Sequence, residues 1–314
     1  MQNPNQVRQE LTARIVAALE QNTIPWRKPW RTSPNAGRPA NCLSRNCYSG
    51  INPLLLELHA HKFGFQSRWW GTFDQWKQLG CTVKRRPEGV ESGAWGCKIV
   101  FYKPVTKSFV DQATGDEDER RFAVLRTWSV FNAEQVEGED VGKFLVDDSG
   151  EIGTEPNTFE PAEELIAATG AEIRHGGEQA FYRRPVGNWP HHIDGDYIAM
   201  PMQHRFERLG AYYETLLHEL AHWSEVRLGW EGSYAMGELV AEMSGCFLAS
   251  ELGVPQGEDL ANHAAYLKNW LDAMKGDASF IFHASTQASK VTEFLLGFVR
   301  NHQPGELQNA QTAN

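Results

Sequence analysis

The stretch from Thr215 to Val226 has the sequence TLLHELAHWSEV, and it contains the pentapeptide pattern HExxH. The run is apolar and favours a helix, and residues four apart on a helix lie on one face, so His218 and His222 can reach a single metal ion. Glu219 lies beside them and is placed to take a proton from a metal-bound water. Chance alone would give such a pentapeptide in on the order of a few per cent of chains, so the pattern needs support from elsewhere in the sequence.

That support comes from the segment GELVAE, which begins at Gly237. Glu238 lies 16 residues beyond His222, and Glu242 follows one helical turn later on a helix that is otherwise strongly apolar. Two acids on such a helix are costly unless a cation faces them. We therefore predict that Glu238 is the third metal ligand and that Glu242 orients His218 or His222 as a neighbouring carboxylate. The alternative is that the two acids simply form a solvated helix face.

Composition places these motifs in a folded protein. Of the 314 residues, 41% are hydrophobic and 22% are charged, which are values typical of globular chains. No apolar run is long enough to span a membrane, and residues 1–20 lack the layout of a secretory signal. The five scattered cysteines favour reduced thiols over a disulfide framework, so we expect a soluble, cytoplasmic protein without membrane partners.

Charge divides the chain into two parts. Residues 1–110 contain 16 Lys and Arg against 6 Asp and Glu, a net of +10, whereas residues 111–314 contain 14 against 34, a net of −20. A reversal of this size predicts two units with different partners.

Periodicity and turn residues predict an α+β fold with a small mixed N-terminal domain and a mostly helical C-terminal domain that has a short sheet. We expect domains at 1–133 and 157–303, a Gly- and acid-rich linker at 134–156 and a disordered tail at 304–314. Asn52 and Thr72 are predicted N-caps, and residues 25–39, with four prolines, are a predicted extended arm. The predicted helices are 7–19, 54–63, 73–79, 161–169, 212–228, 235–252, 258–275 and 278–301. The predicted strands are 82–86, 98–105, 121–131, 171–174, 180–183 and 197–200, with a loop at 111–119.

The basic N-terminal segment also contains six of the eleven tryptophans. Binding of single-stranded nucleic acid without base specificity needs cations for the phosphates and aromatic faces for the bases. The candidates are Trp26, Arg27, Lys28, Trp30, Arg31, Arg68, Trp69, Trp70, Lys84, Arg85 and Arg86. The alternative is that these are core rings and a solvated basic face, and we expect half of the six tryptophans to be buried.

Several longer motifs resemble the ArdC antirestriction family of conjugative plasmids. In the C-terminal half these are HELAHW, YAMGELVAEMSGCFLASELG and the upstream HHIDGDYIAMP. In the N-terminal half they are PWRKPW, YSGINPLLL, RWWGTFDQWKQLG and RTWSVFNAEQ, in that order, so the resemblance spans about residues 5–300. The chain departs from the family where Gly237 replaces the first Glu of Glu-Glu-Leu-Val-Ala-Glu.

The resemblance implies a single-stranded-DNA-binding N-terminal domain and a C-terminal zincin-like metallopeptidase domain of the gluzincin kind. It implies Zn²⁺ as cofactor, with Mn²⁺ or Co²⁺ as alternatives, since two His and a Glu accept several divalent ions. It also implies that the strand at 197–200 is an edge strand that receives a peptide by β-addition, with a host protein as the substrate. Tyr212 or Tyr213 is placed to reach toward the site, although core packing is expected for at least one of them.

Three functions remain open at this point. The first is an antirestriction protein that binds incoming single-stranded DNA and protects it from host restriction. The second is a metalloendopeptidase whose basic domain docks onto an acidic protein. The third is a non-enzymatic DNA-binding protein in which a metal only holds helices together, as four closed protein ligands would do.

Overall fold

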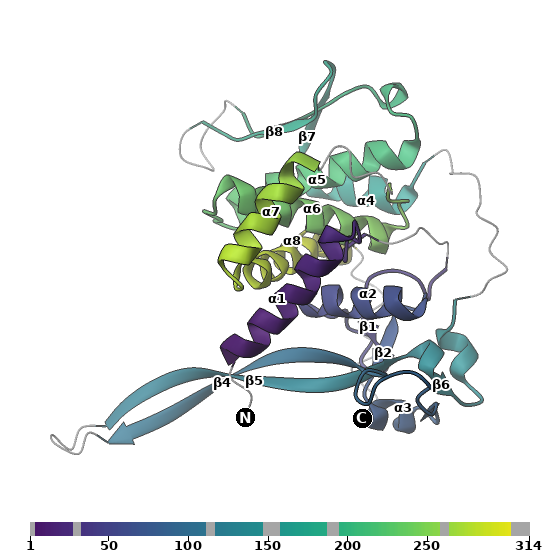
Figure 1. The fold of residues 1–314 in the computed structure, drawn as a ribbon. Coiled ribbons are helices and arrows are strands. Elements are labelled where there is room, and N and C mark those ends of the chain that lie inside the picture. Colours follow the sequence, from purple (N-terminus) through teal and green to yellow (C-terminus); the bar gives the residue numbers. More distant parts are fainter. Residues whose placement is uncertain are drawn as a thin grey trace.

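The computed structural model describes residues 4–27, 33–110, 117–146, 158–186, 195–257 and 264–302. Figure 1 shows two parts joined along a broad contact: a group of C-terminal helices with a small sheet on its outer side, and an N-terminal part from which a long hairpin extends. None of the helices in these ranges has the length and apolar character needed to cross a membrane.

The N-terminal part is built on a four-stranded sheet with the order β1-β2-β5-β4. β4 pairs antiparallel with β5 over its whole length, from Cys97↔Val130 to Val110↔Glu117, and the two strands form the long hairpin. β3 and β6 make a separate two-stranded pairing. The elements of this part are α1 (Pro4–Glu20), β1 (Ala40–Asn41), α2 (Asn52–Phe63), β2 (Trp69–Gly71), α3 (Phe73–Gln78), β3 (Thr82–Val83), β4 (Cys97–Val110), β5 (Glu117–Asn132) and β6 (Val136–Glu137).

The two predicted N-caps behave differently. Thr72 caps α3 through a complete capping box with Gln75, as the sequence predicts. Asn52 is instead the first residue of α2, and the capping position is Ile51, which has no side-chain cap. The Asn52 side chain bonds both the N–H and the carbonyl of Val100, each at 2.9 Å, so it joins α2 to β4 across 48 residues.

The predicted linker begins later than the sequence indicates. Residues 133–146 form β6 and two short 3₁₀ helices, Ala133–Gln135 and Val141–Phe144. Val136 and Phe144 are buried beside Trp76 in a small core of their own. Because the segment is mostly acidic residues and glycine, its few apolar residues did not predict a folded structure. The predicted loop at 111–119 is also shorter, because β5 already begins at Glu117.

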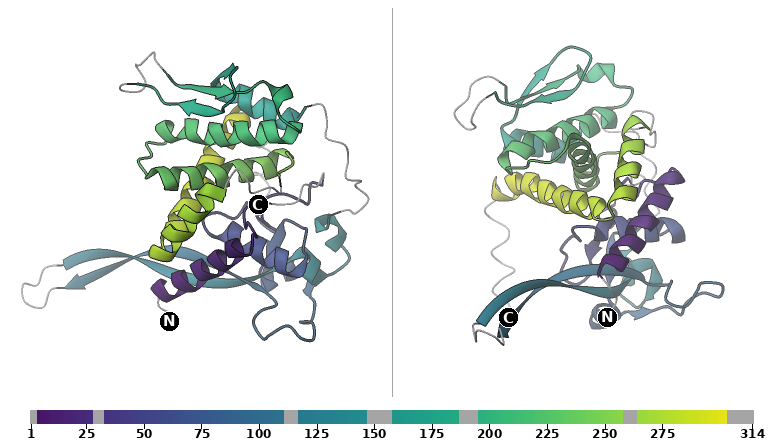
Figure 2. Two further views of the ribbon diagram at one scale, coloured as in Figure 1. Left: turned by 45° about the horizontal axis from the view of Figure 1, so that its top comes forward. Right: turned by 60° about the vertical axis from the view of Figure 1, so that its left-hand side comes forward.

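The C-terminal part is predominantly helical, as predicted, with a three-stranded sheet of order β7-β9-β8. Its strands are β7 (Glu172–His175), β8 (Phe181–Arg183) and β9 (Tyr197–Met200). Its helices are α4 (Glu160–Thr169), α5 (Leu209–Arg227), α6 (Tyr234–Leu252), α7 (Ala264–Gly276) and α8 (Phe280–His302). Figure 2 shows α5 and α6 side by side, with the small sheet beyond α5. The predicted tail at 304–314 lies outside the described residues.

One hydrophobic core crosses between the two parts. The main cluster of buried side chains includes Leu11 and Ile15 of α1, Leu54 of α2 and Trp270 of α7. Helix α1 contacts both α2 and α7, and Trp26 packs edge-on against Trp270 with ring centroids 6.3 Å apart. Residues 4–27 therefore contribute to the core of the C-terminal helices as well as to the N-terminal part.

Candidate metal centre and its surroundings

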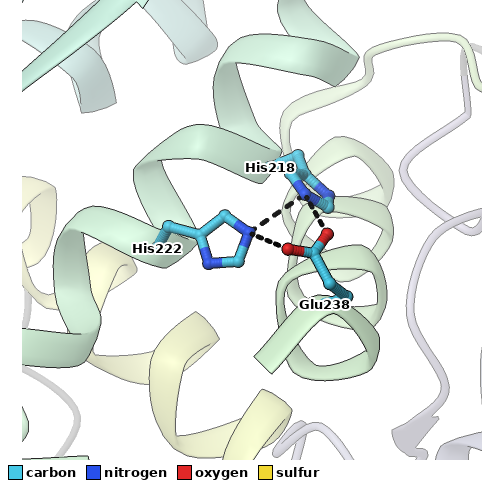
Figure 3. A group of neighbouring side chains, drawn as sticks. All are labelled: His218, His222 and Glu238. Atoms are coloured by element: carbon cyan, nitrogen blue, oxygen red, sulfur yellow. Dashed lines mark hydrogen bonds and ion pairs between the residues drawn. The ribbon is translucent and has the colours of Figure 1, made fainter. Parts of the chain in front are cut away.

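Three predicted ligands converge between α5 and α6 (Figure 3). One donor atom each of His218, His222 and Glu238 lies within 4.8 Å of the other two. The two Nε2 atoms are 3.2 Å apart, and each lies 3.7 Å from an oxygen of Glu238. Two imidazole nitrogens and one carboxylate suit zinc and also accept manganese or cobalt, so the residues present fit a divalent ion. Among the described residues no fourth donor joins this group.

The imidazole nitrogens that face away from the group have partners of their own. His222 Nδ1 lies 2.8 Å from Glu225 Oε1, and Glu225 in turn pairs with Arg184. His218 Nδ1 lies 3.9 Å from Glu242 Oε2. A partner on Nδ1 leaves Nε2 to a metal and fixes the orientation of the ring. Glu242 thus lies near His218, one of its two predicted partners. Glu225 was not predicted as a partner of His222, although its position three residues later places it on the same helix face.

The acids and histidines of this group shift one another's pKa values. Burial by itself would lower the pKa of His218, but the hydrogen bond to Glu238 and the charges of Glu219 and Glu242 raise it above its usual value. Burial raises the pKa of Glu238 as well, yet the bond from His218 and the charge of His222 bring it below the ordinary glutamate value. The carboxylate that faces the two histidines is therefore held in its charged form.

Glu219 is placed differently from the three ligand candidates. It is buried, and it lies outside the converging group although it lines the same cleft. Burial raises its pKa, against the charges of His218 and His222 and a hydrogen bond from the backbone of Tyr182. A carboxylate with a raised pKa beside a metal-binding group has the character of a general base.

The group opens onto a cleft of about 1060 Å³. Phe181 and Tyr182 of β8 line one part of it, and Tyr266 and Trp270 of α7 line another. This volume lies at the upper end of the range for small-molecule sites, so the cleft has room for a segment of extended chain.

The strand beside this cleft is not the one that the sequence predicted. β9 (Tyr197–Met200) lies in the middle of the small sheet, since β7 and β8 pair with its two sides, so it is not an edge strand. Among the strands that the structure describes, the edge strand at the cleft is β8. The residues of a strand do not specify which strands it will pair with. The sequence of β9 therefore could not show that β9 has a partner on each side.

Trp26 and Trp70, two of the tryptophans predicted to stack on bases, are core residues with exposures of 2% and 1%. Neither offers a ring face to a base, so these two assignments are wrong. Trp76 is buried as well, so three of the five N-terminal tryptophans that the structure describes are buried, while Trp30 lies outside the described residues. Trp69 is partly buried, with Arg45 4.5 Å from the centre of its ring.

Two of the arginines predicted to contact DNA have internal partners. Arg27 pairs with Glu214 and Glu242, and Arg68 pairs with Glu251 at 2.8 Å. Buried Arg38 pairs with Glu251 and Glu293. All of these acids belong to the C-terminal helices, so part of the opposite charge of the two halves serves their mutual contact.

The remaining nucleic-acid candidates divide by position. Lys84, Arg85 and Arg86 are exposed after β3. Lys28, Trp30 and Arg31 lie outside the described residues. Tyr212 and Tyr213 both pack in the core, where Tyr212 bonds His175 and Tyr213 bonds Glu163, so neither reaches the metal group.

Gly237, where the chain departs from the family pattern, is closely covered. A Cβ at this position would lie 3.1 Å from the Trp230 ring and 3.3 Å from Glu225 Oε1. A glutamate there would crowd the carboxylate that holds His222, so glycine suits this arrangement.

A pair of facing helices that carry HExxH and a downstream glutamate, beside a small sheet, defines a zincin-like metallopeptidase domain. The family model described as "Zincin-like metallopeptidase" matches residues 160–287, and that of the "N-terminal domain of anti-restriction factor ArdC" matches residues 5–131. The chain belongs to the ArdC antirestriction protein family.

Two solved structures are similar to this chain over nearly its whole length. The metal-free crystal structure of antirestriction protein ArdC from the R388 plasmid is 33% identical with a TM-score of 0.69, and the match covers 94% of this chain and 98% of that one. The Mn(II)-bound structure of the same protein is 31% identical with a TM-score of 0.67, and covers 94% and 99%.

Two relatives are similar in sequence. Protein y4eC of Sinorhizobium fredii, whose full name describes it as uncharacterized, is 31% identical over 98% of this chain and 97% of its own length. DNA primase TraC of Escherichia coli is 33% identical over 92% of this chain, which spans only 27% of TraC.

Proposed function

We propose that this protein acts in the cytoplasm of a recipient cell, where it binds incoming single-stranded DNA and protects it from host restriction. We further propose that its C-terminal part is a zinc metallopeptidase that acts on a protein of the host. The observation that carries the second proposal is the convergence of His218, His222 and Glu238 beside buried Glu219 in an open cleft.

A divalent ion held by these three residues would supply Lewis-acid polarisation of a peptide carbonyl and a lowered pKa of water. Glu219 then accepts the proton of the attacking water at its carboxylate and returns it to the departing amine. Glu225 keeps the His222 ring oriented through a hydrogen bond at Nδ1, and Glu242 places a negative charge 3.9 Å from Nδ1 of His218.

Strand β8 accounts for how a peptide would be held. Among the described strands β8 pairs only with β9, so its other edge, at the cleft, can offer backbone groups to an extended segment, which is the recognition mode of β-addition. The backbone of Tyr182 lies close enough to Glu219 to lower the pKa of its carboxyl, so the same strand lies beside the proposed base. A substrate paired with β8 would thus lie beside the group that moves the proton.

The experiment for this part is a cleavage assay with an unfolded protein as substrate, in the presence of Zn²⁺ or Mn²⁺. Cleavage that disappears in the Glu219→Gln variant supports the proposal. Absence of cleavage by the wild-type chain on a broad panel of unfolded substrates contradicts it. A purely structural metal is disfavoured by the presence of only three donors in the described group and by the size of the cleft.

The DNA-binding part is supported by the net charge of +10 over residues 1–110 and by the exposed Lys84, Arg85 and Arg86. A gel-shift titration with a labelled single strand tests it on the full chain. The affinity should fall with salt, with a slope of about −0.7 for each phosphate neutralised. Failure to bind would favour the other candidate, in which the basic surface docks an acidic protein.

A further inference from the structure

The β4–β5 hairpin carries two exposed aromatic rings side by side. Phe101 is 46% exposed and Trp128 is 50% exposed. In the antiparallel register Phe101 pairs with Arg126, and Trp128 pairs with Ile99. Paired residues, and residues two apart, share a face of a sheet, so Phe101 and Trp128 are diagonal neighbours with Arg126 opposite Phe101.

This pair is distinct from the other exposed rings of the described residues. Those are Phe73, Phe181 and Tyr234, with exposures of 52%, 42% and 72%. Phe181 and Tyr234 line the metal-site cleft, and Phe73 stands by itself on α3. Within the described part of the chain, Phe101 and Trp128 stack on no other ring and Arg126 meets no acid. Two rings and a guanidinium are thus available together.

We propose that the face defined by Phe101, Arg126 and Trp128, here called the hairpin face, is a stacking platform for single-stranded DNA. Bases stack on the two rings, and Arg126 contacts a phosphate between them. The inference rests on the proposed DNA-binding function and gives it a location, which the buried Trp26 and Trp70 cannot supply. The chemistry selects a single strand, because bases paired inside a duplex have no free face for a ring.

Fluorescence anisotropy of the full-length protein with a labelled oligothymidine tests the platform. Trp128→Ala and Phe101→Ala should each weaken binding about 5- to 150-fold, which corresponds to ~1–3 kcal/mol per stacked base. Trp128→Phe should recover most of the loss, since any aromatic face serves. Arg126→Gln should reduce the salt slope by about 0.7, the value for one phosphate contact.

The matched controls are Phe73→Ala, an equally exposed ring on α3, and Thr127→Ala, an exposed residue on the opposite face of β5. Both should bind like the wild type. If the wild type binds and the Trp128 and Phe101 variants bind equally well, the hairpin face is not the platform, although the DNA-binding proposal survives. If the wild type itself does not bind, the proposed function fails. Arg126→Glu provides an independent arm should an aromatic variant fold poorly, and unchanged affinity in that variant would also overturn the inference.

Discussion

Arg27 and Glu242 form an ion pair across 215 residues of sequence, with Arg27 Nε donating to Glu242 Oε1 at 3.1 Å. Arg27 also donates to the carbonyl of Gly257 and pairs with Glu214, and all three residues line the metal-site cleft. The other oxygen of Glu242 faces His218. A residue of the N-terminal arm is thereby two contacts away from a candidate metal ligand.

We expect Arg27→Ala to destabilise the protein by about 3–5 kcal/mol, because it leaves Glu214 and Glu242 with less compensation in a buried setting. Urea unfolding of the apoprotein measures the loss. Arg208→Ala is the matched control, since Arg208 also pairs with Glu214 but is more exposed. Equal stability of the Arg27→Ala and wild-type proteins would show that the pair adds nothing.

Metal binding tests the ligand group directly. The wild-type protein should hold about one divalent ion per chain, and His222→Ala should lose it, because the remaining His218 and Glu238 offer only two donors. Elemental analysis after gel filtration measures occupancy. Full occupancy in the His222→Ala protein would mean that the ion lies elsewhere.

Glu225→Gln tests the residue that orients His222. The amide is a weaker acceptor for the Nδ1–H than a carboxylate, so metal affinity should fall about 10- to 100-fold. Competition with a chromogenic chelator gives the affinity. Glu172→Gln, an exposed acid on β7, serves as the control and should leave the affinity unchanged.

Glu219→Gln separates the two proposed activities. The substituted amide cannot accept a proton, so peptidase activity should fall ~10²–10⁴-fold, while metal content and single-strand affinity persist. Protection of transferred DNA in a restricting recipient is the informative measurement, and we expect it to persist at least in part. Loss of protection with normal DNA binding would make proteolysis the operative step.

Because His59 is buried, we expect the folded protein to lose stability in mild acid. Burial among Phe63, Phe65 and Trp70 lowers the pKa of His59 to about 4, below the usual 6.5. Between these values the unfolded chain binds a proton that the folded chain does not, so stability falls as the pH drops from about 6.5 to about 4. The total is of order 3 kcal/mol.

Urea unfolding at a series of pH values measures this effect. His59→Gln keeps a donor for the Trp95 carbonyl, which His59 Nε2 meets at 3.2 Å, but it does not titrate. The variant should therefore lose less stability than the wild type across this window. His61→Gln, an exposed position on the same helix, should follow the wild type. A wild-type-like slope in the His59→Gln protein would assign the acid sensitivity to other groups.

Features that depend on short-range geometry could be predicted from the sequence. The four-residue spacing of His218 and His222 fixes them on one face of any helix, and Thr72 caps α3 through a partner three residues away. Helical periodicity also placed α4, α5, α6 and α8 within a few residues of their ends. Glu238 could be predicted as a metal ligand because two acids on an apolar helix are costly unless a cation faces them.

The tertiary structure alone decided which partner each remaining group meets. Trp26 and Trp70 are aromatic residues in a basic segment, as expected for a surface on which bases stack. In the folded chain both are buried in the core that joins α1, α2 and α7. Arg27 and Arg68 resemble phosphate contacts, yet they meet acids more than 180 residues away. The sequence predicted β9 as an edge strand of the small sheet, but β9 pairs on both sides and β8 lies at the edge beside the cleft among the described strands. Strand pairing depends on the neighbouring strands and not on the strand's own residues. The charge or apolar character of a residue shows that it needs an ionic or a packing partner. Which residue is that partner depends on the folded chain.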